Sequence, residues 1–173
     1  MPGPVFIRGE QVDLHPVDEE DLPFLQRIIN DPEVWLTLAR ATPATMLDED
    51  AFYEETVQST NNEHLIIAVE GEPVGIIGLN DINSTWGTGE LGYFLATSYH
   101  GKGYGTEAVE LITEWAFDHL RLEKLIASVL SENEASAAVL EKNGFQEEGR
   151  LTEYAFVDGE RLDLLLFGRR ADS

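Results

Sequence analysis

The sequence predicts a single α/β (α+β) domain with a mixed, mostly antiparallel central sheet of about seven strands, flanked by helices. First, 173 residues with 43% hydrophobic composition can build one sizeable core but not two typical domains. Second, short apolar runs bounded by turn residues alternate with longer stretches of helical periodicity. Third, neither repeats nor low-complexity linkers divide the chain, so we expect one domain over residues 1–173.

The first half begins with a predicted strand and three predicted helices. Residues 6–14 alternate between apolar and polar types, as a half-buried strand does. Asp18 is a candidate N-cap for the first helix, and Asp31–Pro32 ends that helix because the residue before proline avoids the helical region. Two further helices are predicted at 33–38 and 48–58.

Two hairpins and one crossover complete the chain. Strands are predicted at 65–69 and 73–79 around the turn 70–72, and at 146–157 and 161–169 around Asp158–Gly159. Between the hairpins lie a strand at 90–95, a helix at 103–120, a strand at 124–130 and a helix at 135–143. Because a helix joins the strands at 90–95 and 124–130, those two strands should be parallel if they pair.

The most informative stretch is residues 93–106, YFLATSYHGKGYGT, in which glycine occupies positions 101, 103 and 105 just before a helical pattern. Alternate glycines let successive backbone N–H groups converge, and the helix adds its first-turn donors, so a phosphate or pyrophosphate fits. A dinucleotide fingerprint needs glycine where Thr106 stands, and a P-loop needs Gly-Lys-Ser/Thr, so neither matches. Such glycine spacing also occurs in plain strand-to-helix turns.

The order ELGYFLATSYHGKGYGTEAVELITEWAF, followed by LEKLIASVLSENEASAAVLEKNGF, resembles the acetyl-CoA-binding core of the GCN5-related N-acetyltransferases (GNAT). The opening IRGEQVDLHPVDEEDLPFLQRIINDPEVWLTL is similar to the branch that includes ribosomal-protein N-terminal acetyltransferases and spermidine acetyltransferases. The resemblance covers nearly the whole chain. It implies a GNAT-like domain in which the parallel strand pair splays apart at the CoA site, with acetyl-CoA as co-substrate.

The resemblance also implies which residues bind the cofactor. The family's loop reads Gln/Arg-x-x-Gly-x-Gly/Ala, and His100 departs from it at the first position. The implied cofactor-binding residues are Phe94 and Leu95 beside the pantetheine arm, His100, Gly101, Lys102, Gly103, Tyr104, Gly105 and Thr106 around the pyrophosphate, and Asn133 and Ser136 in the second CoA segment. Local chemistry offers another interpretation of that second segment, with Asn133 as a helix N-cap and Gly144 as a helix stop.

Acetyl transfer to an amine requires removal of a proton, and Glu90 is the first candidate for the general base, acting through a water, because it opens the strand that reaches the thioester. Asp81 is the weaker alternative, and Glu90 is equally compatible with a role as one surface carboxylate among 33 acidic residues. A backbone N–H near Phe94 would stabilise the oxyanion. His100 is expected near phosphates rather than near the acyl group.

The leaving thiolate needs a proton donor. Many relatives place a tyrosine at the position that is Leu140 here, so the usual acid is missing. Ser136 is the replacement candidate by the resemblance, and its alternative role is that of a helix-capping hydroxyl. Tyr93 and Tyr154 are further possibilities. Trp35 and Trp86 lie in segments expected to contact the acceptor, although aromatic residues more often serve packing.

The amino-acid composition limits which metals, partners and cellular locations are expected. There is no cysteine and the four histidines lack metal-ligand spacing, so we expect no metal. The net charge of −22 argues against nucleic acid and is typical of a solvated acidic surface, as in a halophilic host, or of a site for cationic substrates. We expect a cytoplasmic protein with no membrane partner, because no signal peptide or membrane-spanning run is present.

The function predicted is an acetyl-CoA-dependent N-acetyltransferase that acts on a primary amine, either a peptide N-terminal α-amine or a small amine such as a polyamine. The expected partners are that amine and a second copy of the chain in a homodimer. The rival hypothesis is a non-catalytic acyl-CoA-binding regulator of the same fold, which the missing tyrosine and the altered loop position motivate. The third hypothesis is a protein whose phosphate loop binds a nucleotide other than CoA.

Overall fold

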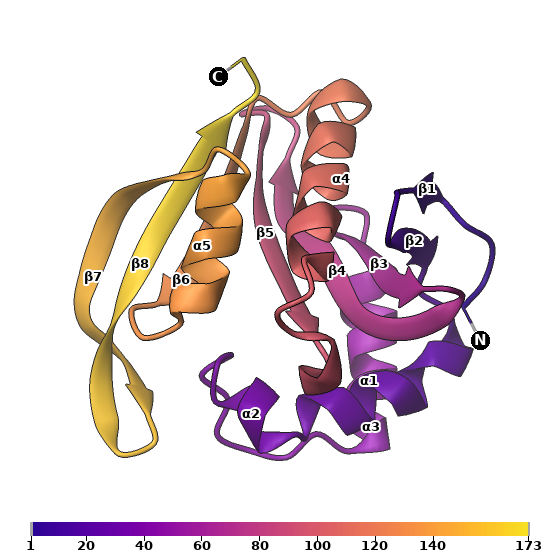
Figure 1. Ribbon diagram of the computed structural model, residues 1–173, viewed down its shortest axis with the longest axis horizontal. Coiled ribbons are helices and arrows are strands. Elements are labelled where there is room, and N and C mark those ends of the chain that lie inside the picture. The colour runs from indigo at the N-terminus through magenta and orange to yellow at the C-terminus, as the bar shows by residue number, and fades with distance from the viewer. Residues whose placement is uncertain (1, 173) are drawn as a thin grey trace.

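Eight strands form one sheet in the order β1-β2-β3-β4-β5-β6-β8-β7 (Figure 1). The computed structural model describes residues 2–172. The strands are β1 (Ile7–Arg8), β2 (Asp13–Pro16), β3 (Glu63–Val69), β4 (Glu72–Asn83), β5 (Thr88–Leu95), β6 (Lys124–Leu130), β7 (Gln146–Val157) and β8 (Glu160–Arg170). Every neighbouring pair is antiparallel except β5 and β6, which are parallel. The predicted mixed, mostly antiparallel sheet is therefore confirmed.

The strand expected at residues 6–14 is instead a small hairpin, which raises the strand number from about seven to eight. β1 pairs with β2 in antiparallel register, with Ile7 opposite Leu14. The chain reverses between them because the Glu107 carboxylate accepts hydrogen bonds from the backbone amides of Gln11 and Val12, at 2.9 and 2.8 Å. A glutamate 95 residues downstream in the sequence thus fixes a turn that the alternation pattern does not reveal.

The helices lie close to their predicted positions. They are α1 (Leu22–Ile29), α2 (Pro32–Trp35), α3 (Met46–Phe52), α4 (Tyr104–Asp118) and α5 (Glu134–Lys142). Asp18 and Asp21 form a capping box at a short 3-10 turn that leads into α1. The predicted helix at 33–38 is only the four-residue α2, and the one predicted at 48–58 divides into α3 and a π-helical turn, Tyr53–Val57.

Helices cover the two faces of the sheet unequally. In Figure 1, α4 and α5 lie in front of the sheet, and their side chains join the larger core cluster, which includes Ile77, Leu91, Ile112, Phe145 and Phe167. A smaller cluster occupies the opposite face, where Leu22 and Leu25 of α1 pack on Ile66 and Ile76. None of the helices within residues 2–172 combines the length and the apolar character that a bilayer-spanning helix requires.

Candidate acyl-transfer site

The glycine loop connects the end of β5 to the start of α4. Gly101 and Gly103 have φ of +73° and +84°, in the left-handed region that side chains with Cβ rarely adopt. Gly103 is the N-cap of α4, and no side chain within residues 2–172 caps this 15-residue helix. Its first-turn N–H groups are therefore available to an anion, with the positive end of the helix dipole behind them.

Gly105 has a different role, because it lies inside the first turn of α4 and is buried. A Cβ at this position would lie 3.3 Å from the Tyr93 ring and 3.5 Å from Leu95. Glycine thus lets the start of α4 approach β5 closely. The same contact fixes the Tyr93 ring beneath the helix.

A cavity of about 530 Å³ opens between this loop, the end of β5, α2 and the start of α5. Its size is typical of small-molecule sites. Ten of the eleven residues predicted to bind the cofactor line it, namely Phe94, Leu95, His100, Gly101, Gly103, Tyr104, Gly105, Thr106, Asn133 and Ser136. Lys102 is the exception, and its Nζ lies 5.6 Å from the centre of the Tyr99 ring. Lys142, at the end of α5, adds a positive charge to the wall.

The His100 ring lies against the main chain of β5. Its Nε2 is 2.9 Å from the Leu95 carbonyl oxygen, so an Nε2–H donates to that carbonyl. This contact holds the imidazole at the loop, away from Ser136. His100 thus lies in the loop before α4 and lines the larger cavity.

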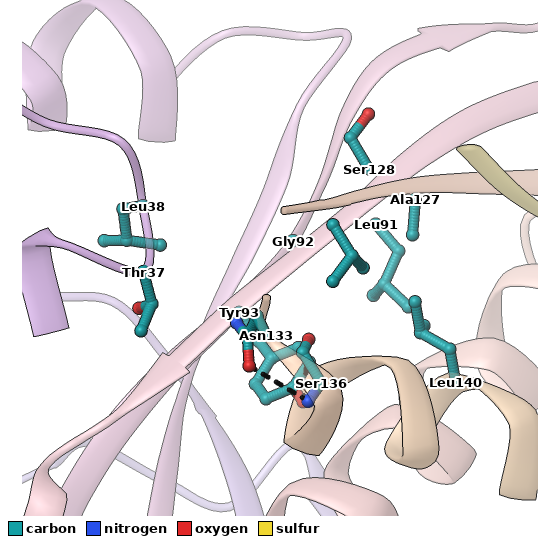
Figure 2. Close-up of a pocket in the computed structure, with 11 residues that line it drawn as sticks. Thr37, Leu38, Leu91, Gly92, Tyr93, Ala127, Ser128, Asn133, Ser136 and Leu140 are labelled. Atoms are coloured by element: carbon teal, nitrogen blue, oxygen red, sulfur yellow. Dashed lines mark hydrogen bonds between the residues drawn. The ribbon is translucent and has the colours of Figure 1, made fainter. Parts of the chain in front are cut away.

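A second, smaller cavity of about 120 Å³ marks the point where β5 and β6 separate. The two strands pair from Thr88–Lys124 to Glu90–Ile126, and no further pairs follow although both strands continue. Leu91, Gly92 and Tyr93 of β5 line this cavity together with Ala127 and Ser128 of β6 (Figure 2). The splayed parallel pair that the resemblance implied is therefore present, and it leaves unpaired backbone groups beside a cavity.

Four residues line both cavities: Thr37, Tyr93, Asn133 and Ser136. Asn133 is the N-cap of α5, as predicted, because its Oδ1 accepts a hydrogen bond of 3.2 Å from the Ser136 amide. This cap orients the first turn of α5 so that the Ser136 hydroxyl lies 3.4 Å from the Tyr93 hydroxyl. Figure 2 shows the three side chains grouped together, with Thr37 and Leu38 across the cavity.

Tyr93 is a buried phenol at this junction. Burial raises the pKa of Tyr93, and the hydrogen bond with Ser136 opposes that rise only in part. The phenol therefore stays protonated at neutral pH and can donate a hydrogen bond. Leu140, the position at which the family resemblance led us to expect a tyrosine, lines the smaller cavity and is 1% exposed. Tyr93 thus supplies from β5 a phenol that α5 lacks.

The structure does not bring Glu90 together with Ser136. Glu90 is half-buried at the last position where β5 pairs with β6, and it lines neither cavity. Because side chains alternate along a strand, Glu90 projects from the face opposite to that of Leu91 and Tyr93. Any base action by Glu90 would thus come from the other side of the splayed strands.

The remaining candidates lie away from the two cavities. Asp81 is exposed at a bulge of β4 with φ of +51°, and Tyr154 is 62% exposed on β7. Trp86 is 75% exposed, and neither it nor Trp35 lines either of these two cavities. From α2 and the segment after it, Glu33, Val34 and Thr37 line the larger cavity instead. No sequence signal marks these three residues, because only the fold places them over the glycine loop.

No group of three His, Cys, Asp or Glu residues within 2–172 has a geometry that could hold a metal ion. The arrangement offers a cradle of backbone donors, a cavity running along an unpaired strand edge, and two hydroxyls at the strand opening. Such a site suits a long anionic ligand whose far end reaches the opening.

Comparison with known proteins gives this geometry a context. Residues 11–146 match the family model described as Acetyltransferase (GNAT) domain. The chain is 27% identical over 152 residues to the spermidine N(1)-acetyltransferase of Escherichia coli (strain K12), a match that covers 88% of this chain and 82% of that protein. It is 28% identical over 172 residues to the ribosomal-protein-serine acetyltransferase of the same strain, covering 95% of this chain and 96% of that protein.

Among solved structures, the fold is similar to that of spermidine N-acetyltransferase from Vibrio cholerae in complex with CoA and spermine. The TM-score is 0.89, with 21% identity over 95% of this chain and 98% of that chain. Another similar fold is that of the microcin C7 self-immunity acetyltransferase in complex with acetyl-CoA and AMP, with a TM-score of 0.79 and 20% identity over 94% of this chain and 93% of that chain.

Proposed function

Because the chain belongs to the GNAT acetyltransferase family, we propose that it transfers the acetyl group of acetyl-CoA to a primary amine by direct attack on the thioester. The observation that carries the proposal is the junction of the two cavities at Tyr93, Asn133 and Ser136. One cavity begins at a glycine cradle for phosphates, and the other lies where β5 and β6 separate. We take residues 1–173 as the single domain that performs this reaction.

In this proposal the glycine loop binds the CoA pyrophosphate. The amides from Lys102 to Thr106 donate to it, the His100 ring lies in the same loop, and Lys142 supplies positive charge in a chain whose net charge is −22. The pantetheine arm lies along Phe94 and Leu95, where β5 has lost its neighbour β6. The thioester thereby reaches the smaller cavity.

The transfer itself needs a base and an acid on opposite sides of the thioester. Glu90, through a water, takes the proton that the amine loses as its nitrogen bonds to the carbonyl carbon. The carbon–sulfur bond breaks, and the thiolate takes a proton from the Ser136 hydroxyl, which Tyr93 can resupply across 3.4 Å. The positions of Glu90 and Ser136 on opposite sides of the sheet fit this division of roles.

The acceptor class is proposed from the relatives and from charge. The two relatives named above are a spermidine and a ribosomal-protein-serine acetyltransferase, so a polyamine or a peptide α-amine is the acceptor proposed here. Both are cations that an acidic protein attracts. We further propose that the protein works in the cytoplasm of a halophilic host, without a metal or a nucleic-acid partner, and as a homodimer.

The test is CoA release with a panel of amines, combined with acetyl-CoA binding by calorimetry. Acetyl-CoA should bind to the wild type, and at least one polyamine or peptide should support saturable CoA release. Ser136→Ala and Tyr93→Phe should each lower kcat by about tenfold or more, and Glu90→Gln by about a hundredfold, with the Kd for acetyl-CoA unchanged.

Matched controls keep the assignments separable. Ser128→Ala removes a hydroxyl from the β6 side of the smaller cavity, and Asp81→Asn removes the alternative base, so both should retain wild-type kcat. Acetyl-CoA binding without transfer to any amine would favour a regulatory protein over an enzyme. Displacement of acetyl-CoA by ATP would favour a binder of other nucleotides. A normal kcat in Glu90→Gln would remove Glu90 from the mechanism but leave the reaction intact.

A further inference from the structure

Gly92, in the middle of β5, differs from every other glycine of the chain. The described residues include all 15 glycines, and each of the others either has a positive φ or would bring a Cβ within 4 Å of another residue. The φ of Gly92 is not positive, and a Cβ there would meet no atom of residues 2–172 within 4 Å. Glycine inside a strand weakens it and is typical of a bulge or of a place where a ligand approaches the backbone. The pairing of β5 with β4 is regular at Gly92, which leaves the ligand.

The open space over Gly92 lies on the face of β5 that carries Glu90. Because side chains alternate along a strand, a side chain at position 92 would point to the same face as Glu90, two residues earlier. Gly92 is exposed on this face, whereas Leu91 is buried on the other one and the Tyr93 ring lies there against α4. The Gly92 backbone also lines the smaller cavity. Gly92 therefore lies where the face of Glu90 meets that cavity.

The space over Gly92 is closed on one side and open on the other. On the β4 side, Gly92 pairs with Gly78, and the His64 ring of β3 lies over Gly78 at the place that a Cβ would take. On the β6 side, the pairing with β5 ends at Glu90 and Ile126, so β6 forms no pair at Gly92. A ligand can therefore lie on the Gly92 backbone with the imidazole beside it and can extend toward the gap between the strands.

We propose that the space over Gly92 holds the carbon chain that bears the attacking amine, and that Gly92 is a specificity-determining residue for the acceptor. This inference rests on the acetyl transfer proposed above. In that reaction the amine nitrogen reaches the thioester in the smaller cavity while its proton leaves toward Glu90, so the amine lies between the two. Gly92 occupies that place on β5. Acetyl-CoA does not need the space, because Gly92 does not line the larger cavity.

The test is to fill the space in two steps, with Gly92→Ala and Gly92→Val. For the amine that the wild type acetylates, kcat/KM should fall about tenfold in Gly92→Ala and further in Gly92→Val, through a higher KM at a nearly unchanged kcat. The Kd for acetyl-CoA, measured by calorimetry, should stay within about twofold of the wild-type value. Both variants should melt at or above the wild-type temperature, because alanine and valine suit a strand better than glycine and a Cβ at position 92 meets no atom of residues 2–172.

Gly149→Ala is the matched control. Gly149 lies within β7, its φ is not positive, and a Cβ there would make an ordinary contact of 3.6 Å with the Leu166 side chain. It lines neither of the two cavities. Gly149→Ala therefore adds the same methyl group to a strand away from the site, and its kcat/KM should stay within about twofold of the wild-type value.

Three results would overturn the inference while the wild type is active. They are an unchanged kcat/KM in folded Gly92→Val, a rise in the Kd for acetyl-CoA in place of the KM for the amine, and a loss of activity that is matched by a lower melting temperature. The first two would leave the proposed acetyl transfer intact, and the third would make Gly92 a structural glycine. A wild type that acetylates no amine would instead reject the proposed function, and this inference with it.

Discussion

At the scale of single residues, His64 shows how burial sets an ionisation. Its ring lies directly over Gly78 of the neighbouring strand, where a Cβ would collide with the imidazole, and it packs edge-on against Phe52 at 5.3 Å. Its Nδ1 is buried with no hydrogen-bond partner among residues 2–172. Burial lowers the pKa of His64, and a hydrogen bond with the Asn80 side chain opposes this in part. The folded protein thus favours the neutral ring.

This gives a stability prediction with a definite sign. Because the folded pKa of His64 lies below the ordinary value of 6.5, the unfolded chain takes up the proton first as the pH falls. The contribution of the neutral ring is therefore complete above about pH 6.5 and is lost as the pH falls through the folded pKa. His64→Gln should lose less unfolding free energy than the wild type between pH 8 and pH 5.5 in urea titrations.

His119→Gln is the control for this comparison, because His119 is exposed at the end of α4. It should retain the wild-type pH dependence. If His64→Gln shows the same loss of stability as the wild type over this range, burial does not determine the protonation of His64. The effect of His64 is obtained by subtracting the pH dependence of His64→Gln from that of the wild type. This subtraction is needed because burial also raises the pKa of Glu49, so protonation of Glu49 stabilises the fold as the pH falls, opposite to the effect of His64.

At the scale of elements, α4 is connected to the N-terminal hairpin as well as to the sheet. Glu107 in its first turn accepts hydrogen bonds from the backbone amides of Gln11 and Val12, which lie between β1 and β2. A carboxylate in the first turn also interacts favourably with the helix dipole. The helix that carries the glycine cradle is therefore fixed at its first turn by a segment far away in the sequence.

Glu107→Ala should lower the free energy of unfolding by about 1–3 kcal/mol, because two backbone N–H groups lose their charged acceptor. Chemical denaturation monitored by fluorescence measures the change. Glu110→Ala removes the same charge from an exposed position of the same helix, and we expect it to stay within about 0.5 kcal/mol of the wild type. Equal effects of the two substitutions would show that net charge, rather than the connection to the hairpin, explains the loss.

At the scale of the whole molecule, the net charge of −22 opposes compaction. The acidic groups outside β6, β7 and β8 outnumber basic ones by 28 to six, so most of the surface repels itself in dilute buffer. Few ion pairs offset this repulsion, because the chain has only 11 lysine and arginine residues. Stability should therefore depend on the ionic strength of the solution.

The melting temperature should rise by about 5 °C or more between 0.01 M and 0.2 M NaCl, where the Debye length falls from roughly 30 Å to below 10 Å. Differential scanning calorimetry measures this shift. Sucrose at matched osmolality is the control, because sucrose is excluded from the protein surface but does not screen charge. A melting temperature that does not change over this salt range would mean that self-repulsion contributes little to stability.

Much of the fold and of the cofactor cradle is determined by local sequence. The left-handed glycines at 101 and 103 and the Asn133 cap are short-range features, and residues near them in the chain are sufficient to specify them. The hairpin turns at Gly71 and Gly159 follow the same logic. The helix between β5 and β6 predicts that these strands are parallel, as they are, whereas the GNAT-like arrangement of the whole sheet was implied by the family resemblance.

What the tertiary structure alone decided are the contacts between segments far apart in the chain. Tyr93 meets Ser136 only because β5 and α5 flank the same cavity, and Glu107 divides the expected strand at 6–14 only because α4 packs beside it. Periodicity and turn chemistry act over a few residues, whereas these contacts depend on packing across the whole sheet, which no local pattern encodes.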